Sequence, residues 1–267
     1  MAWKTLYPLA GGTGPMNGTN ARLPVLTFHA LDKRSSVISF SPHLFRDGMA
    51  RLHEKGYRTL RLSQVAGILI RGEAFPDHSF VITFDDGYES VYEVAFPVLR
   101  DCGMSATVFI TVGEKGPRKP GSRLPSLEGR PMLTWTQIEE MHQGGIDFGG
   151  HTLTHPDLTR LPREQVQTEV CDGKAVLENI LGAPISCFAY PFGRYNREVQ
   201  RIVRQSFRLA CSDKLGFLKR RSDLFALERV DAYYLRTDRL FKLLLTKLFP
   251  WYIGLRGIPR QIRRKLL

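Results

Sequence analysis

The stretch Val81-Ile82-Thr83-Phe84-Asp85-Asp86-Gly87-Tyr88 decides the fold class. Its apolar half predicts a buried strand over Phe80–Phe84, and two acids and a glycine follow directly. In an α/β fold, active sites gather at the carboxyl ends of the parallel strands. Asp85 and Asp86 would then approach one site from different angles, one binding a cation while the other stays free. The alternative is an Asp-Gly turn that begins the next helix.

Further apolar runs of this kind predict four more buried strands, at Val25–Phe28, Ala106–Thr111, Ile146–Gly149 and Ser186–Tyr190. Between them, apolar residues at three- and four-residue spacing predict helices over 42–55 with Ser41 as N-cap, 88–102, and 162–181 ended by Gly182. Strands that alternate with helices indicate βαβ units and a parallel sheet, either a barrel or doubly wound. The stretch Glu114–Pro131, rich in Pro, Gly and basic residues, is expected to be a long loop at one rim.

The composition is that of an ordinary globular protein. A chain of 267 residues can bury a sizeable core, and its 43% hydrophobic residues exclude disordered and collagen-like classes. The four cysteines are scattered, which argues against a disulfide scaffold, and Cys187 and Cys211 lie in apolar runs typical of buried positions. No strand is followed by a GxGxxG or Walker sequence, so nucleotide binding has no support.

The net charge of +12 is concentrated at the C-terminal end. Between Arg236 and Leu267, nine basic residues stand against one acid, so this segment carries +8 of the +12. The basic residues alternate with LFKLLLTKLFPWYIGL, a pattern more typical of an interfacial membrane segment than of a nucleic-acid groove, and we expect no nucleic-acid partner. The alternative is a C-terminal helix that packs on the domain and keeps a solvated basic face.

The N-terminal residues are a poor match to a signal peptide, and we find no apolar run long enough for a spanning helix. The expected location is therefore cytoplasmic, with possible peripheral contact on the inner face of the membrane. We expect the chain to divide into an N-terminal extension (1–22), one main domain (23–235) and a basic amphipathic tail (236–267).

A second group of candidate residues lies in Ile146–Leu158, IDFGGHTLTHPDL. His151 and His155 are four residues apart, so on a helical turn both imidazoles would face the same way, and Gly149 and Gly150 suit a tight turn before them. Together with a strand-end carboxylate they form a His₂-carboxylate set, which leaves coordination positions open as catalytic metal sites do. The alternative is two histidines that share a solvated face by chance.

Two further strand ends carry candidate groups. In Cys187–Asn196, CFAYPFGRYN, a strand runs into Pro-Phe-Gly, whose backbone amides could serve as an oxyanion hole; a simple closing turn is the alternative. His29 follows the first strand, in LPVLTFHALD, and is either functional or a structural histidine.

The sequences TFDDG, HTLTH and YPFG, in this order, resemble the polysaccharide deacetylase family, also called the NodB-homology family or carbohydrate esterase family 4. The resemblance covers Leu23 to Asp231. It implies a distorted (β/α) barrel of about seven strands, a divalent metal ion that is usually zinc, and an N-acetylated glycan substrate.

The resemblance also assigns roles. Asp86, His151 and His155 match the metal ligands, and Asp85 matches the catalytic base. The backbone N–H of Phe192 matches the oxyanion donor.

Three features of the commoner members are missing. Those members carry an arginine where Ala189 stands, a tryptophan motif that we cannot find near Cys211–Phe217, and a late histidine that acts as general acid. This chain has no histidine after His155.

FAYPFG and a histidine on the first strand instead resemble the subfamily that deacetylates poly-N-acetylglucosamine and related exopolysaccharides. The barrel of that subfamily is circularly permuted, so the segment with the acid lies N-terminal. Leu26–His29 would be that segment, with His29 as the acid. Arg229, in LERVD, is a candidate for the arginine that orients the catalytic aspartate.

The expected activity is hydrolysis of an N-acetyl group by metal-activated water. Two other functions stay open. The first is a deformylase or amidase acting on a lipid-linked amino sugar, which the basic apolar tail motivates. The second is a glycan-binding protein without activity, which the missing arginine and tryptophan motivate.

Overall fold

The structure is a computed structural model that describes residues 21–113 and 122–266. Almost all of the predicted N-terminal extension, and the first part of the predicted loop Glu114–Pro131, lie outside these residues.

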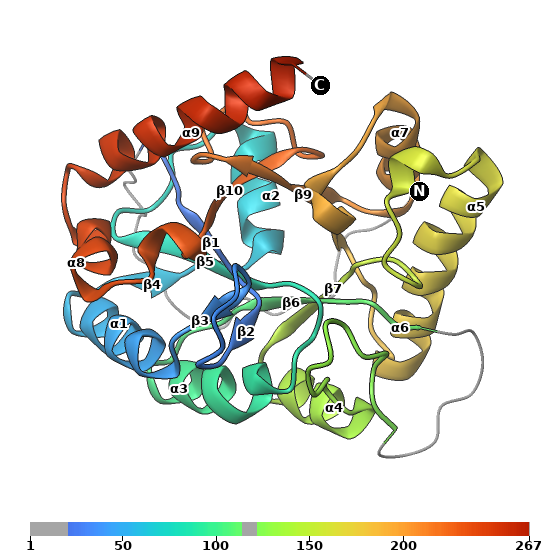
Figure 1. The fold of residues 1–267 in the computed structure, drawn as a ribbon, viewed down its shortest axis with the longest axis horizontal. Coiled ribbons are helices and arrows are strands. Elements are labelled where there is room, and N and C mark those ends of the chain that lie inside the picture. Colours follow the sequence, from blue (N-terminus) through green and yellow to red (C-terminus); the bar gives the residue numbers. More distant parts are fainter. Residues whose placement is uncertain (1–20, 114–121, 267) are drawn as a thin grey trace.

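Within the described residues, seven parallel strands close into a barrel (Figure 1). They are β1 (Val25–Phe28), β5 (Ser79–Phe84), β6 (Thr107–Ile110), β7 (Asp147–Gly150), β8 (Cys187–Ala189), β9 (Leu209–Leu215) and β10 (Leu227–Asp231). Each strand pairs with the next along the chain, and β1 closes the ring by pairing with both β5 and β10. This confirms the predicted barrel, and β1, which leads into His29, lies beside the last strand as the permuted arrangement requires.

The smaller strands lie outside this ring. The short strand β4 (Arg58–Thr59) pairs with the first residues of β5, and β2 (Ala30–Leu31) and β3 (Ser39–Phe40) form a separate parallel pair.

Helices surround the barrel (Figure 1). The α-helices are α1 (Pro42–Glu54), α2 (Leu62–Arg71), α3 (Phe96–Asp101), α4 (Trp135–Gln143), α5 (Arg163–Gln167), α6 (Gly173–Leu181), α7 (Arg197–Ser206), α8 (Asp238–Phe241) and α9 (Phe249–Leu266). The 3₁₀ segments are η2 (Leu158–Arg160), η4 (Pro191–Gly193), η5 (Ala232–Leu235) and η6 (Lys242–Leu245). Two π-helical turns, η1 (Val91–Ala95) and η3 (Thr168–Asp172), continue into α3 and α6.

The helix ends follow the predicted signals. The Ser41 side chain accepts a hydrogen bond from the Leu44 N–H, which caps α1 as expected. Gly182 ends α6 in the left-handed conformation, also as expected. The helical region predicted over 88–102 begins later, at Val91, because the chain is still turning after Asp86.

The tight turn predicted at Gly149 and Gly150 is wrong, because both residues belong to β7. A Cβ atom on Gly149 would lie 2.5 Å from the Phe109 ring, so glycine leaves room for an aromatic side chain on the adjacent strand. The glycine at position 149 is therefore explained by packing inside the barrel and not by a turn.

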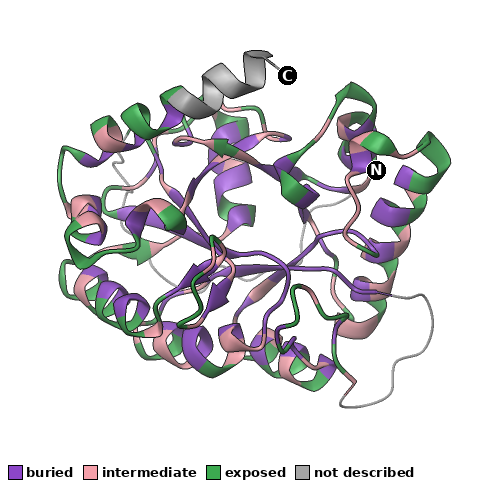
Figure 2. Cartoon of the chain, viewed as in Figure 1, coloured by how far each residue is buried: buried purple, intermediate pink, exposed green. Residues whose placement is uncertain are grey.

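The described part of the C-terminal tail is helical and packs on the barrel. Phe249 and Ile253 are buried, and the Phe249 ring lies 5.3 Å from that of Phe217. In Figure 2 the buried residues line the barrel strands and the inward helix faces, and part of α9 shares this burial. No helix in the described part of the chain is long and apolar enough to cross a membrane.

Candidate active site

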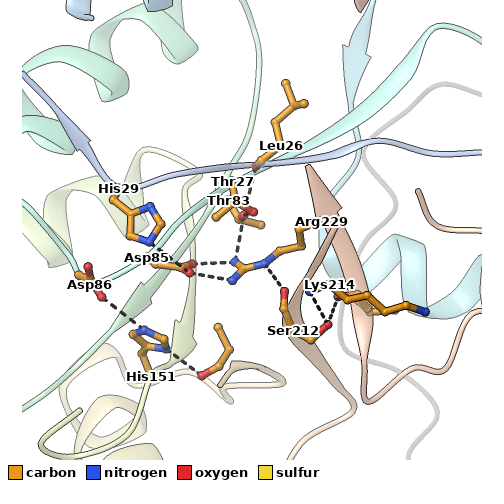
Figure 3. A network of polar contacts seen from close by, with 12 residues as sticks. Leu26, Thr27, His29, Thr83, Asp85, Asp86, His151, Ser212, Lys214 and Arg229 are labelled. Atoms are coloured by element: carbon orange, nitrogen blue, oxygen red, sulfur yellow. Dashed lines mark hydrogen bonds and ion pairs between the residues drawn. The ribbon is translucent and has the colours of Figure 1, made fainter. Parts of the chain in front are cut away.

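Several predicted site residues meet at the carboxyl ends of the strands. Figure 3 shows His29, Asp85, Asp86, His151 and Arg229 close together. Asp85 and Asp86 directly follow β5, His151 follows β7, and His29 follows β1. The parallel register puts these ends at one rim, since Phe28 pairs with Phe84. Sequence segments more than a hundred residues apart therefore contribute to one cluster.

Asp85 forms a buried ion pair with Arg229 of β10. The guanidinium donates two hydrogen bonds to the carboxylate, of 2.8 Å and 2.7 Å. Arg229 is itself held by the Ser212 carbonyl at 3.0 Å and by the Thr83 hydroxyl at 3.4 Å. Arg229, on the last strand, therefore contacts the aspartate that the resemblance expected it to orient.

Asp86, His151 and His155 face one another. The Nε2 atoms of both histidines lie 3.4 Å from the same Asp86 oxygen, and the three candidate ligand atoms lie within 4.8 Å of one another. A tetrahedron with roughly 2.0–2.1 Å from centre to corner has edges of about 3.4 Å, so the two distances to Asp86 fit a zinc-sized ion.

The orientation of His151 also suits a ligand. Its Nδ1 lies 2.8 Å from the Ala189 carbonyl oxygen, which can only accept a hydrogen bond. A proton is thereby held on Nδ1, and Nε2 faces Asp86 as the atom that could bind an ion. The carboxylate and two imidazoles fit a divalent metal ion.

The two histidines are not on a helical turn, so that part of the prediction is wrong. Residues 151–155 form an irregular loop in which Thr152 has φ 73° and His155 has φ 64°. These left-handed conformations are unfavourable for residues with a side chain, and they cluster at functional sites. Asp86 and Phe192 share the same feature, with φ 76° and 57°.

A buried carboxylate holds this loop in place. Glu169 accepts hydrogen bonds from the backbone N–H groups of Leu153 and Thr154, at 2.9 Å and 2.8 Å, and from the Thr154 hydroxyl at 2.7 Å. It lies in the π-helical turn η3, a distortion that is frequent at functional sites. Sequence reasoning missed Glu169, and its position in a helical pattern gave no signal.

Phe192 lies beside the candidate metal ligands. Its ring is 4.8 Å from that of His155 and remains exposed. Its φ of 57° interrupts the short η4 segment. Two residues farther on, Arg194 donates to Asp157 at 2.7 Å, so an ion pair joins the Phe192 loop to the His155 loop.

His29 lies at the edge of the cluster. Its Nε2 is 3.9 Å from Asp85 Oδ2, and its side chain is partly exposed. All seven predicted site residues therefore lie on elements around this rim.

The electrostatics lower the pKa of both aspartates, through different neighbours. Burial alone would raise the pKa of Asp85, but the charge and hydrogen bonds of Arg229 outweigh it and lower the pKa. Burial opposes ionisation of Asp86 too, but a hydrogen bond and positive charge from neighbouring histidines hold its pKa well below the ordinary value. Both carboxylates are ionised at neutral pH.

The pKa values of the two histidines, by contrast, are shifted in opposite directions. Burial and then the charge of His151 lower the pKa of His155 to about 4, which keeps that imidazole neutral. Burial also disfavours a charged His151, but the hydrogen bond to Asp86 and the nearby carboxylates raise its pKa.

Tyr88 is a second residue that the sequence reasoning did not single out. It is buried, and its pKa is raised by burial, by the negative charge of Asp86 and by a hydrogen bond to that carboxylate. Its place at the end of TFDDGY was the available signal.

The barrel and this rim define a class of protein, a (β/α)-barrel enzyme with a candidate metal centre at the strand ends. A model of polysaccharide deacetylases matches residues 72–206. The chain is 31% identical over 211 residues to YxkH of Bacillus subtilis (strain 168), which is named as a polysaccharide deacetylase, covering 79% of this chain and 71% of the relative. The chain belongs to the polysaccharide deacetylase family.

Shorter or more distant relatives are named for one polymer. Poly-beta-1,6-N-acetyl-D-glucosamine N-deacetylase of Escherichia coli (strain K12) is 35% identical over 130 residues, which span 46% of this chain and only 19% of that protein. The protein of the same name from Staphylococcus aureus (strain MSSA476) is 24% identical over 188 residues, covering 67% of this chain and 62% of the relative.

Solved structures share the fold. The Streptococcus pyogenes deacetylase PplD, in complex with acetate, superposes with a TM-score of 0.70 at 28% identity, over 80% of this chain and 93% of that one. IcaB from Ammonifex degensii superposes with a TM-score of 0.68 at 24% identity, over 84% and 98%.

Proposed function

We propose that this deacetylase removes N-acetyl groups from an N-acetylated amino-sugar polymer, with a divalent ion, usually zinc in this family, held by Asp86, His151 and His155. The observation that carries the proposal is the spacing of 3.4 Å between the Asp86 oxygen and both imidazole nitrogens. When bound, such an ion would supply Lewis acidity and lower the pKa of a water molecule.

Asp85 is the proposed base. It lies next to the ligand Asp86, yet its own carboxylate is engaged by Arg229 and stays ionised. An ionised carboxylate that is fixed in position can take a proton from attacking water. Arg229 is the residue that fixes it.

His29 is the proposed acid, and the Phe192 backbone N–H the proposed oxyanion donor. A partly exposed imidazole near Asp85 can deliver a proton to the departing amine, which is a poor leaving group without one. Phe192 has a left-handed backbone conformation, and its ring lies beside that of His155. Its backbone N–H therefore belongs to a turn next to the proposed metal ligands. A fixed N–H in such a place can stabilise negative charge on a carbonyl oxygen.

The proposed substrate is a polymer of N-acetylglucosamine or a related sugar. The names of the Escherichia coli and Staphylococcus aureus relatives support this class. The exposed Phe192 ring beside His155 also offers an apolar surface against which a sugar ring can pack. The complete cluster of carboxylates and histidines weighs against a glycan-binding protein without activity.

The Asp85→Asn variant tests the assignment. The metal-loaded variant should retain its ion and lose acetate release from N-acetylglucosamine oligomers by about 10²–10⁴-fold. Asp47→Asn, at an exposed site on α1, is the matched control and should keep full activity. Full activity in Asp85→Asn would sink the assignment of the base.

A substrate screen separates the remaining alternatives. The wild-type protein is offered N-acetylated oligosaccharides and N-formylated lipid-linked amino sugars, and acetate and formate are measured. Release of formate but not acetate would establish the deformylase instead.

A further inference from the structure

Helix α9 exposes a row of large apolar side chains, which we call the outer stripe. The stripe comprises Leu248, directly before the helix, and Trp251, Leu255 and Ile258 within it, with exposed fractions of 65%, 74%, 53% and 50%. Their spacing of three, four and three residues places the last three on one face of the helix and Leu248 in line with that face, just before its first turn. Isolated exposed apolar residues need no explanation, but a contiguous row of this kind marks an interaction site.

The outer stripe does not face the barrel, because α9 packs on the barrel through another face. Phe249 and Ile253 are buried there, and the Tyr252 hydroxyl donates to the Tyr234 carbonyl at 2.7 Å. At 100° per residue, Phe249 and Ile253 point roughly opposite to Trp251 and Leu255. The helix is fixed to the domain and presents its second apolar face outward.

A group of cations from distant parts of the chain lies next to α9. We call it the basic cluster, and it comprises Arg22, Arg71, Lys219, Arg220 and Arg221, which line a surface cavity of about 880 Å³. A second cavity, of about 310 Å³, is lined by Arg22 and Lys219 of this cluster and by Gly254 and Gly257 of α9. The basic cluster therefore adjoins the helix that carries the outer stripe.

The charges nearby are mostly positive. In the basic cluster, Arg71 is paired with Glu73, and Arg220 donates to the Gly72 carbonyl. Arg256 on α9 and Lys247 just before it are exposed as well. The segment from Arg236 to Leu267 carries nine basic residues and one acid.

We infer that the outer stripe and the basic cluster form one surface that docks on an anionic lipid bilayer. The apolar side chains would enter the boundary between headgroups and acyl chains, where tryptophan is favoured, while the cations contact anionic headgroups. A second copy of the chain fits less well, because its own cations would face those of the first. This inference does not depend on the assignment of catalytic roles.

Co-sedimentation of the full-length, metal-loaded protein with vesicles tests the inference. The protein should sediment with vesicles of phosphatidylcholine and phosphatidylglycerol, and far less with phosphatidylcholine alone or in high salt, where screening weakens the attraction. The variant Trp251→Ser/Leu255→Ser should bind at least about tenfold more weakly. Val37→Ser removes an equally exposed apolar side chain away from α9 and should bind as the wild type does.

A charge variant tests the second half of the surface. In Lys219→Ser/Arg221→Ser, the loss of two cations should weaken binding to the anionic vesicles by about 25-fold, or about fivefold for each. Acetate release from soluble oligomers should be unchanged in both double variants, which shows that they are folded. Wild-type partition of either variant, or equal binding to both kinds of vesicle, would overturn the inference. So would a dimer that binds no vesicles and becomes monomeric in Trp251→Ser/Leu255→Ser.

Discussion

Arg229 donates two parallel hydrogen bonds, of 2.8 Å and 2.7 Å, to an Asp85 carboxylate that lies 144 residues earlier in the chain. Both side chains are buried, so each charge is stabilised by the other in place of water. The fork of the guanidinium also fixes the plane of the carboxylate, which a lysine could not do. The pair therefore controls both the ionisation and the orientation of the proposed base.

Arg229→Gln should lower the rate of acetate release by about 10²-fold or more and move the acid limb of the pH–rate profile to higher pH. In the wild type, Arg229 outweighs burial and lowers the pKa of Asp85. Without Arg229, burial dominates and the pKa rises, and a base works only when it is deprotonated. Deacetylation followed from acid to neutral pH checks this.

The conservative variant Arg229→Lys separates charge from geometry. In this variant the acid limb of the pH–rate profile should return toward its wild-type pH, since a positive charge remains beside Asp85. The maximal rate should stay low, because the contact through two parallel hydrogen bonds is lost. Arg204→Gln, at an exposed ion pair on α7, is the control. An unchanged acid limb in Arg229→Gln would exclude Arg229 as the residue that tunes Asp85.

Much of the fold could be predicted because strands buried on both sides are apolar. Five strands of the barrel were predicted within two residues of their ends. The last two were missed because β9 and β10 carry Asp213, Lys214, Glu228 and Arg229. In the structure Lys214 pairs with Glu228, and Arg229 turns inward to Asp85, so these charges have partners that local patterns do not reveal.

The site was predictable as a set of residues but not as a conformation. Strand ends and the spacing of the histidines identified His29, Asp85, Asp86, His151 and His155 as candidates. The resemblance to a family then assigned their expected roles and drew attention to Arg229. The backbone around His155 was predicted wrongly, since spacing alone cannot distinguish a helical turn from a loop with left-handed residues. Glu169 could not be predicted, because its partners are backbone groups 15 and 16 residues away.

Removal of the metal ion should abolish activity, and zinc should restore it. Dialysis against a chelator leaves Asp86, His151 and His155 without an ion to hold. His155→Ala should reduce both the metal content and the rate of acetate release, whereas His53→Gln, at an exposed site on α1, should change neither. Metal analysis and acetate assays on the same samples check this. Full activity of the metal-free protein would contradict the proposed mechanism.

Glu169→Ala should weaken metal binding by about 10–100-fold, although Glu169 is no ligand. The substitution leaves the N–H groups of Leu153 and Thr154 without their acceptor in a buried loop. Titration with zinc in the presence of a competing chelator measures the effect.

Glu169→Gln should bind metal almost normally, because an amide oxygen can still accept both N–H groups. Glu164→Ala, on the exposed side of α5, is the control. Equal metal affinity in Glu169→Ala and the wild type would show that the loop holds its shape without this carboxylate.

Gly149→Ala should destabilise the protein by about 1–3 kcal/mol, because a Cβ atom would overlap the Phe109 ring. Gly254→Ala is the matched control, since a Cβ atom there meets nothing within 4 Å. In α9 this change should stabilise the helix by up to about 1 kcal/mol. Urea unfolding measures both, and a Gly149→Ala protein as stable as the wild type would mean that the barrel interior yields to the extra methyl group.

His29→Gln should reduce acetate release from N-acetylglucosamine oligomers by about 10²–10⁴-fold, with its metal content unchanged. An amine leaves poorly unless it is protonated, and His29 is the imidazole at the edge of the cluster, 3.9 Å from Asp85. An aryl acetate ester needs no such proton, since its phenolate leaves unaided, so the variant should hydrolyse the ester at nearly the wild-type rate. His43→Gln, at an exposed site on α1, should leave both activities intact. Equal losses on amide and ester would instead assign His29 a role in binding or positioning, because a proton donor affects only the substrate that needs the proton.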